Sequence, residues 1–374
     1  MAEGAREEKA SSVDLGFVEE TDSWRLLSRF FPSKVGGKPA WLALKSVPTA
    51  CELDCGVCGK PTVFLLQVYS PRTDQTTCFH RTVFVFCCRN PPCHARNSAT
   101  PFRVYRSQLP RQNDFYDFEP PDEDTPSSEA EVLQAEKEYN LCCVCGCGGA
   151  KACSRCHQVR YCSKEHQVLD WRAGHKAACG AEDGILPMAR VQLLFPEFDL
   201  VTEPEEWEEG EGDGEDAGED KEEKLREYED YMRQLRHNQD RAGGSDLQEK
   251  DLEAAARQET EEDQQFSVFR RRVRKEPEQV LRYDLGGAPL WVSRQHIPTA
   301  EDIPDCTCGA PRQLEFQVMP QLLNYLQVDS LKDSIDWGTL AVYTCVNSCE
   351  QGTAYHPEFL WKQDYSETAL TGAP

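Results

Sequence analysis

The sequence predicts a mainly β protein of the α+β class, with a cysteine-rich segment and an acidic segment inserted between two similar β-rich halves. Three observations predict this arrangement. Both ends of the chain are rich in the aromatic and β-branched residues that favour strands. A block near the N-terminus recurs near the C-terminus, and cysteines, histidines and then acids cluster between the two copies. We therefore expect one pseudo-symmetric, two-halved domain that carries a small finger and a disordered acidic loop.

The repeat is the strongest of these observations. Gly36 to Val68 matches Gly286 to Val318 without a gap, at an offset of 250, with twelve identities in 33 positions. Trp41 aligns with Trp291, so we expect these two side chains to be comparably buried. Two separate small domains of common ancestry would also produce a repeat. We favour a single domain built from both halves.

Changes in composition predict the boundaries of the segments. They give a flexible N-terminus at 1–13, an N-terminal half at 14–118, a linker at 119–134, a finger at 135–182, an acidic disordered or helical insertion at 183–265, and a C-terminal half at 266–374.

The formal net charge of -24 indicates the kind of partner to expect. Glu203 to Glu223 holds thirteen acids and one lysine, which is half of that excess and is typical of a disordered loop. Acidic surface repels phosphate, so the charge argues against direct nucleic-acid binding and favours a basic protein partner. We expect a monomer.

The nineteen cysteines indicate metal binding. No apolar run is long enough to span a membrane, and the N-terminus lacks the apolar stretch of a secretory signal, so we expect a cytoplasmic and nuclear protein. Disulfides are rare in such reducing compartments. Cysteines that cluster with histidines there are candidate ligands of zinc.

Four ligand pairs lie within 38 residues in the finger. Two residues between cysteines form a tight knuckle, and three residues place two ligands one helical turn apart. Eight ligands make two closed tetrahedral zinc sites. The pairs are Cys142 and Cys145, Cys153 and Cys156, Cys162 and His166, and His175 and Cys179.

The motif YCSKEHQVLDW, followed by HKAAC, resembles the MYND zinc finger. In that family the first and third pairs share one zinc and the second and fourth pairs share the other. His166 stands where the family commonly has cysteine, but imidazole at this position can serve the same metal. Cys143 and Cys147 are surplus to the two sites, and Cys143 could replace Cys142 only by shortening the knuckle.

Four protein ligands leave no open position on either zinc, which predicts structural and not catalytic metal. The sequence also lacks a GxxxxGK phosphate loop, a GxSxG elbow and an HExxH helix. We therefore expect a binding protein that is not an enzyme. MYND fingers bind proline-rich peptides, and the resemblance implies a groove at Ser154, Gln167 and Trp171, although Trp171 could equally be a core residue.

Two further cysteine sets lie in the β-rich halves. One has the spacing of a zinc site, whereas the other has a single residue between its first two cysteines, which is short for a knuckle. We expect one or two further zinc ions here, and buried free thiols are the alternative. The sets are Cys55, Cys58, Cys88 and Cys93, and Cys306, Cys308, Cys345 and Cys349.

A wider resemblance covers nearly the whole chain except the acidic segment. CGVCGKPTVFLLQVYSP, FVFCCRNPPC, CTCGAPRQLEFQVMPQLLNYL and SIDWGTLAVYTCVNSC are similar to the programmed cell death protein 2 family. The resemblance implies a chaperone for one basic small-subunit ribosomal protein, the eukaryotic counterpart of bacterial S-five, in assembly of the small ribosomal subunit. The alternative is a nuclear adaptor that recruits corepressors through proline-rich peptides, with roles in cell proliferation or apoptosis.

A basic run extends from Arg270 to Lys275. It could be a nuclear-import or nucleic-acid patch. Phe266, Phe269 and Val273 recur at helical spacing and favour a solvated helix face instead.

Overall fold

The structure, a computed structural model, describes residues 13–122, 138–180, 193–206, 261–328, 335–350 and 354–365, together with residues 124 and 126. Most of the predicted flexible N-terminus and most of the predicted acidic insertion lie outside these described residues.

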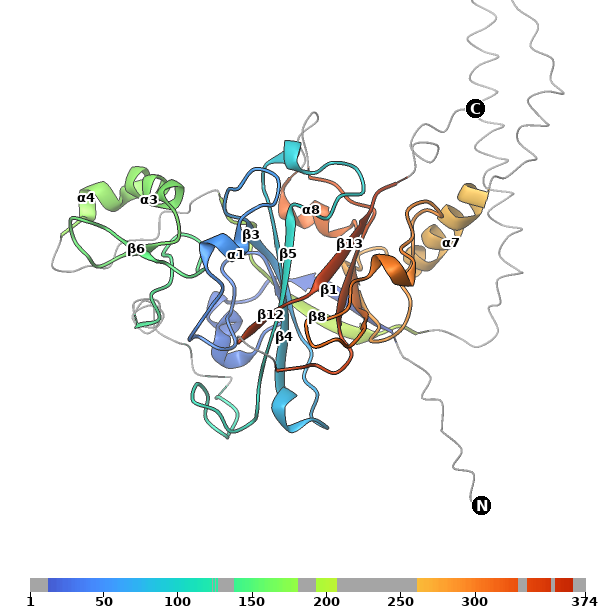
Figure 1. Cartoon of the computed structure of the whole chain (residues 1–374), viewed down its shortest axis with the longest axis horizontal. Helices are drawn as coiled ribbons and strands as arrows, with labels where there is room; N and C mark the ends of the chain where they lie inside the picture. Colours follow the sequence, from blue (N-terminus) through green and yellow to red (C-terminus); the bar gives the residue numbers. More distant parts are fainter. Residues whose placement is uncertain are drawn as a thin grey trace, which may run out of the picture.

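Strands from both halves form one antiparallel sheet, in the order β12-β5-β4-β3-β2-β8-β1-β9-β10-β11-β13 (Figure 1). The chain is therefore mainly β, as predicted. The alternative explanation of the repeat was two separate domains, but strands from both halves join the same sheet. The strands are β1 Asp14–Glu19, β2 Lys34–Val35, β3 Val63–Tyr69, β4 His80–Cys87, β5 Phe102–Leu109, β8 Phe198–Pro204, β9 Leu281–Tyr283, β10 Arg312–Val318, β11 Thr339–Cys345, β12 Tyr355–Pro357 and β13 Phe359–Gln363.

The two ends of the sheet are joined by a single residue. β12 pairs with β5 at one end and β13 pairs with β11 at the other, and only Glu358 separates β12 from β13. The buried Glu358 carboxylate accepts hydrogen bonds from Nε of Arg106 at 2.8 Å and from Nε of Arg312 at 2.9 Å. The sheet is thus nearly closed, and Glu358 ties the N-terminal half to the C-terminal half.

One strand corrects the predicted boundaries. Phe198–Pro204, placed in the disordered or helical insertion, forms β8 and pairs with β1 over six residues and with β2 over two. The same strand includes Glu203, which the sequence assigned to the acidic loop. Partners far away in the sequence, not local pattern, stabilise this strand.

Alternating side chains along the strands separate an inner core from an outer face. On β4, Val83 and Val85 belong to the core shared by both halves, whereas Phe84 and Phe86 belong to a second cluster on the outer face. This period-2 pattern is the one that a strand buried on both faces requires.

The helices and turns lie around the sheet (Figure 1), and all of those described except α7 are short. They are α1 Ala50–Leu53, α3 Lys164–Asp170, α4 Lys176–Ala178, α7 Glu261–Lys275, α8 Leu322–Leu326, the 3₁₀ turns η1 Ser23–Leu26, η2 Ser28–Phe30, η3 Thr76–Cys78, η4 Pro91–Cys93 and η6 Ala300–Asp302, and the π turn η5 Trp171–His175. A separate two-stranded sheet joins β6 Lys151–Ala152 to β7 Arg160–Tyr161.

The basic run lies on α7. Phe269 and Val273 are buried against Val292 and Met319, with Phe266 packed beside them, so one face of the helix packs against the loop at Val292 and the residue that follows β10. Arg272, Arg274 and Lys275 occupy the last turn, where positive charge is favourable to the helix dipole. No helix among the described residues combines the length and apolar character needed to cross a membrane.

Candidate metal centres

The first set of finger ligands is brought together by two local structures. A turn closes the Cys142–Cys145 knuckle, where Gly146 adopts a left-handed φ of 74° and its N–H donates to the Cys142 carbonyl at 2.8 Å. Ser163 then caps α3 by accepting a hydrogen bond from the His166 N–H at 3.2 Å. This cap starts the helix so that Cys162 and His166 are one turn apart.

Cys142, Cys145, Cys162 and His166 offer ligand atoms that all lie within 4.8 Å of one another. Sγ of Cys145 is 3.7 Å from Sγ of Cys162, and Nδ1 of His166 is 3.7 Å from Sγ of Cys142. All four residues are buried. His166 therefore reaches the set through Nδ1, despite its departure from the commoner cysteine.

The second finger set unites Cys153, Cys156, His175 and Cys179, again within 4.8 Å. Sγ of Cys153 is 3.8 Å from Sγ of Cys179, and Sγ of Cys156 is 3.6 Å from Nε2 of His175. The structure thus brings the first and third pairs together and the second and fourth pairs together. Nδ1 of His175 is buried and has no hydrogen-bond partner among the residues that the structure describes.

The two outer sets also converge. Each contains a loop closed by a left-handed glycine, Gly59 with φ 64° and Gly309 with φ 82°. Cys55, Cys58, Cys88 and Cys93 lie within 4.8 Å of one another, as do Cys306, Cys308, Cys345 and Cys349. The single intervening residue at Cys306 and Cys308 does not prevent convergence.

The spacing of the ligand atoms fits zinc in all four sets. Zinc–sulfur bonds of about 2.3 Å give a regular tetrahedron with edges of about 3.8 Å. The Sγ–Sγ distances are 3.8 Å for Cys58 and Cys88 and 3.6 Å for Cys308 and Cys345, close to that edge. The four sets are therefore compatible with zinc. Bound there, zinc would crosslink distant parts of the chain with no open position for substrate.

One thiol in each set has a lowered pKa: Cys58, Cys142, Cys153 and Cys306. At Cys142, hydrogen bonds with neighbouring thiols are the largest cause. At the other three, desolvation by burial acts to raise the pKa, but hydrogen bonds from backbone and thiols outweigh it. The pKa falls to about 6 at Cys153 and to about 7 at Cys306. Neighbouring thiols in the same sets have raised pKa values, as at Cys88, Cys145, Cys179 and Cys345. Each set therefore holds one thiolate, the form that binds metal, beside protonated thiols.

The surplus cysteines lie outside the sets. Cys147 is buried, and its Sγ lies 3.8 Å from the Cys145 carbonyl oxygen. Cys143 is half-buried and joins none of the four groups. The structure therefore places Cys142, not Cys143, among the candidate ligands.

The finger packs on the outer face of the N-terminal half, at one side of the sheet in Figure 1. Trp41 is 1% exposed, and its Nε1 donates a hydrogen bond to the Gly146 carbonyl of the knuckle at 2.7 Å. Trp291, in contrast, is only half-buried. The expectation of comparable burial is wrong because the finger covers Trp41 and does not cover Trp291. Sequence reasoning did not find this contact, since the repeat alone does not say which copy the finger covers.

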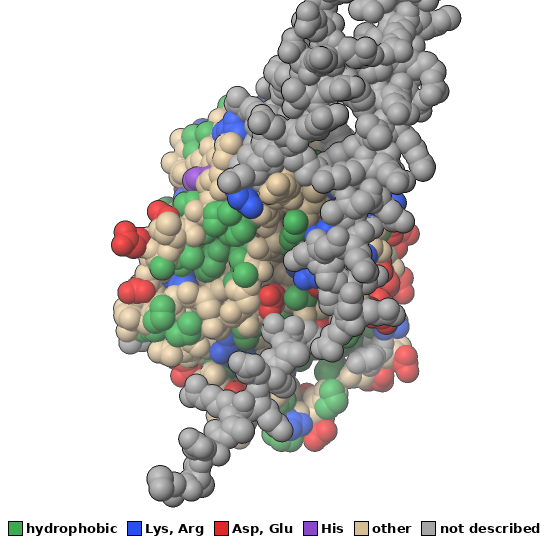
Figure 2. All heavy atoms as spheres, turned by 90° about the vertical axis from the view of Figure 1, so that its right-hand side faces the viewer, with side chains coloured by type: hydrophobic (Ala, Val, Ile, Leu, Met, Phe, Trp, Pro, Cys, Tyr) green, Lys and Arg blue, Asp and Glu red, His purple; other side chains and the backbone are tan. Residues whose placement is uncertain are grey.

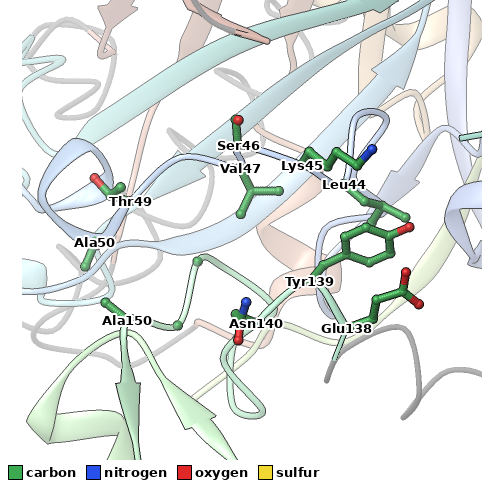
Figure 3. Close-up of a pocket in the computed structure, with 12 residues that line it drawn as sticks. Leu44, Lys45, Ser46, Val47, Thr49, Ala50, Glu138, Tyr139, Asn140 and Ala150 are labelled. Atoms are coloured by element: carbon green, nitrogen blue, oxygen red, sulfur yellow. The ribbon is translucent and has the colours of Figure 1, made fainter. Parts of the chain in front are cut away.

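A pocket of about 420 Å³ lies along the seam between the finger and the N-terminal half. Figure 3 shows Tyr139 and Asn140 on the finger side facing Leu44 and Val47 on the other. The lining contains neither cysteine nor histidine, so the pocket is separate from the metal centres. It is lined by Leu44, Lys45, Ser46, Val47, Thr49, Ala50, Glu138, Tyr139, Asn140, Gly148, Gly149 and Ala150.

The three predicted groove residues lie on the finger. Ser154 is exposed between Cys153 and Cys156, and Gln167 is half-buried on α3. Trp171 is half-buried at the end of α3, and its ring meets the edge of the His175 ring at 5.7 Å between centroids. Trp171 thus supports a candidate ligand and also keeps an accessible face.

Comparison with known proteins supplies the family. Sequence models match the N-terminal domain of programmed cell death protein 2 at residues 12–123, its C-terminal domain at 263–364 and the MYND finger at 142–179. The first domain match covers the predicted N-terminal half, the second covers the predicted C-terminal half except its last ten residues, and the finger match spans the eight ligands. No solved structure was found to match the chain.

Three relatives show how far the similarity extends. Programmed cell death protein 2 of Bos taurus is 48% identical over 97% of this chain and 99% of its own length, and that of Rattus norvegicus is 48% identical over 96% and 98%. Programmed cell death protein 2-like of Homo sapiens is 28% identical over 85% of each chain. The family domains, the finger and the full-length identity together establish that this chain belongs to the programmed cell death protein 2 family.

Proposed function

We propose that this protein is a non-enzymatic, zinc-binding chaperone that holds a basic small-subunit ribosomal protein, the eukaryotic counterpart of bacterial S-five, and supports assembly of the small ribosomal subunit. The net charge of -24 carries this proposal. A strongly acidic chain attracts a strongly basic one over long range, and the attraction screens basic segments from other polyanions.

The metal centres support a role without catalysis. Each of the four sets offers four protein ligands, so zinc there would be coordinatively closed. The ions would then stabilise the finger and the loops at the ends of strands. The protein acts in this proposal as a monomer, in the cytoplasm and the nucleus, where ribosomal proteins are made and assembled.

The two halves act together as one pseudo-symmetric domain in this proposal. The Gln67 carboxamide oxygen accepts from the Ala40 N–H, and the Gln317 carboxamide oxygen accepts from the Leu290 N–H, at positions that differ by 250 in each case. Three further local features support the equivalence. They are capping boxes at Thr49 and Thr299, register shifts at Phe64/Leu66 and Leu314/Phe316, and left-handed glycines at Gly59 and Gly309.

Reconstitution tests the proposal. The full chain, purified with zinc, is mixed with the ribosomal protein and examined by native mass spectrometry and by gel filtration in about 150 mM salt, where non-specific attraction is weakened. We expect a one-to-one complex. Cytochrome c, another small basic protein, is the control and should stay free. A chain that ignores the ribosomal protein, or that binds both proteins equally, contradicts the proposal.

A nuclear adaptor is the second candidate function, and one observation favours it. Trp171 is only half-buried, and the exposed Ser154 and the half-buried Gln167 lie on the same finger, so aromatic and polar groups are accessible there, as a proline-rich peptide would require. The test is binding of a labelled proline-rich peptide from a corepressor. Trp171→Ala should abolish binding, whereas Val268→Ala, at an exposed apolar position on α7, should not. Equal binding by both variants removes this candidate.

A further inference from the structure

On the outer face of the N-terminal half, the two phenylalanines of β4 are fully covered. Phe84 and Phe86 on β4 are 0% exposed and share one cluster with Trp41, Leu141 and Tyr161, of which the last two come from the finger. Both phenylalanines lie on the same face of β4, opposite Val83 and Val85, so this outer face needs a cover of its own. The finger therefore completes the burial of this face.

Strand register locates the equivalent face in the C-terminal half. β4 pairs Phe84 with Tyr105 of β5, while β11 pairs Ala341 with Trp361 of β13. In each half a register shift follows one strand pair, Phe64 with Phe86 in the first half and Leu314 with Tyr343 in the second. Phe84 precedes Phe86 by two residues, and Ala341 precedes Tyr343 by two residues, so Phe84 and Ala341 are equivalent positions. Trp361 of the C-terminal half thus stands where Tyr105 stands in the N-terminal half.

We call this equivalent surface the C-face and define it by Trp291, Ile297, Ile303, Phe359 and Trp361. Four of the five pack together with Leu314, Ala341 and Tyr343, and every member of that cluster comes from the C-terminal half. Ile297 follows His296, whose ring stacks on Trp361 with centroids 4.4 Å apart. None of the described residues of the finger joins the cluster.

The C-face is partly open to solvent. Ile297 is 39% exposed, and Trp291, Ile303, Phe359 and Trp361 are each half-buried. Figure 2 looks onto the side of the molecule that carries α7 and shows hydrophobic side chains gathered at the surface. Large aromatic side chains left in this state are the usual anchors of a protein interface.

Acidic side chains border the C-face. Glu301, Asp302 and Asp305 are exposed and lie within two residues of Ile303. Asp302 forms a capping box with Thr299, and hydrogen bonds from the Thr299 backbone N–H and then from its hydroxyl lower the pKa of the Asp302 carboxyl group. These three carboxylates outnumber the one exposed arginine beside the C-face, Arg294, so the rim carries net negative charge at neutral pH next to an apolar centre.

We propose that the C-face is the docking site for a basic segment of the partner protein, one that carries apolar side chains flanked by lysine or arginine. This inference deepens the proposed function and rests on it for the identity of the partner. Apolar anchors would enter between Trp291, Phe359 and Trp361, and the flanking cations would meet the acidic rim. A second copy of this chain is disfavoured because two chains of net charge -24 repel each other.

The test uses an array of overlapping peptides, about 15 residues long, that tile the small-subunit ribosomal proteins. Full-length zinc-loaded protein is compared with Ile297→Glu and with Val268→Glu. Val268→Glu is the control. It introduces the same charge in the same half of the chain, on α7, at an aliphatic residue that is 37% exposed, whereas Ile297 is 39% exposed. Ile297→Leu is the conservative variant. Thermal unfolding and zinc content verify that all four proteins are folded.

We expect basic peptides with apolar residues to bind the original chain. Ile297→Glu should weaken that binding about tenfold, which is a loss of about 1.4 kcal/mol in binding free energy. Val268→Glu and Ile297→Leu should bind as the original chain does. Absence of binding by any peptide, or equal binding by Ile297→Glu, overturns the docking site. If deletion of 366–374 strengthens peptide binding, or if Ile297→Glu converts a dimer to a monomer without affecting peptides, the C-face has another occupant and the inference is wrong.

The proposed function fails in a different way. Peptides that bind at the C-face but derive only from ribosomal proteins other than the S-five counterpart would leave the docking site intact and remove the named partner. Peptides of the S-five counterpart that bind equally to all variants would keep the partner and remove the site.

Discussion

Arg81 of β4 and Glu315 of β10 form a two-pronged ion pair between strands that are not neighbours in the sheet. Nη1 donates to Oε1 at 2.6 Å and Nη2 donates to Oε2 at 2.7 Å, with both side chains 0% exposed. Thr344 and Tyr283 also donate hydrogen bonds to the carboxylate. The pair connects the two halves inside the molecule, where neither charge has access to water.

The first prediction concerns removal of one partner of this pair. Glu315→Gln should lower the free energy of unfolding by about 3–5 kcal/mol, because Arg81 would remain buried without its counter-charge. Denaturant unfolding in the presence of zinc measures the change. Glu278→Gln, at an exposed position, is the control and should change stability by less than about 0.5 kcal/mol.

The double variant Arg81→Met/Glu315→Leu separates charge from packing. Replacing both partners removes the uncompensated charge, so it should cost less than Glu315→Gln alone. A larger loss in the double variant would mean that the ion pair stabilises the fold more than apolar packing can.

The second prediction is the pH dependence of the same pair. Desolvation acts to raise the pKa of Glu315, but Arg81 and its hydrogen bonds outweigh it and hold the pKa at about 2. A carboxyl whose pKa falls on folding stabilises the folded state above its unfolded pKa, about 4.3, and loses that contribution as pH falls toward 2. The stability gap between the original chain and Glu315→Gln should therefore be constant above about pH 5 and narrow below it. A gap that widens in acid contradicts the assignment.

Local spacing explains why the candidate metal centres could be predicted from the sequence. A knuckle or one helical turn fixes two ligands relative to each other without any knowledge of the rest of the fold, as at Cys142 and Cys145. The pairing of pairs came from the family resemblance. For the second outer set, the sequence alone does not decide between a zinc site and free thiols, because a single residue between Cys306 and Cys308 is an unusual spacing for zinc ligands.

Long-range pairing explains what could not be predicted. β8 lies in a segment whose composition is dominated by acids, and its partners β1 and β2 are more than 160 residues away in the sequence. Arg81 and Glu315 are 234 residues apart, and each looks like a solvent-facing residue of a strand. Such contacts depend on topology, which propensity and periodicity do not contain.

The third prediction tests how the finger is attached. Trp41→Phe keeps the ring packing but removes the donor to the Gly146 carbonyl, and an unpaired buried acceptor should cost about 1–3 kcal/mol. Trp41→Ala should cost about 3–5 kcal/mol. Trp291→Ala should cost less than Trp41→Ala, because Trp291 is half-buried. Urea unfolding of the three variants measures these losses, and equal losses at Trp41 and Trp291 would show that the finger adds nothing to the burial of Trp41.

The fourth prediction concerns zinc. Elemental analysis of the purified chain should give four zinc ions, because four sets have compatible geometry. Cys93→Ser should reduce the count to three, whereas Cys147→Ser, which alters a buried cysteine outside the sets, should keep four. Chelator should remove structure as well as metal, since bound zinc contributes folding free energy. A count of two in the original chain would restrict zinc to the finger, and a count near one would contradict the paired arrangement of its ligands.

The last prediction concerns the acidic segment and the rate of partner capture. Residues 207–223 contain ten acids and one lysine, and they follow β8, so their charge is attached to the sheet at a fixed point. Replacing the ten acids by asparagine and glutamine should slow association with the basic ribosomal protein about tenfold at low salt. The two rates should converge near 1 M salt, where the Debye length is about 3 Å.

A variant that exchanges aspartate and glutamate at the same ten positions keeps the charge and should associate at the original rate. Stopped-flow fluorescence supplies the rates, and because the charge acts mainly on encounter, dissociation should change little. If the neutral variant instead dissociates faster and associates normally, the segment contacts the partner directly and its charge does not steer encounter.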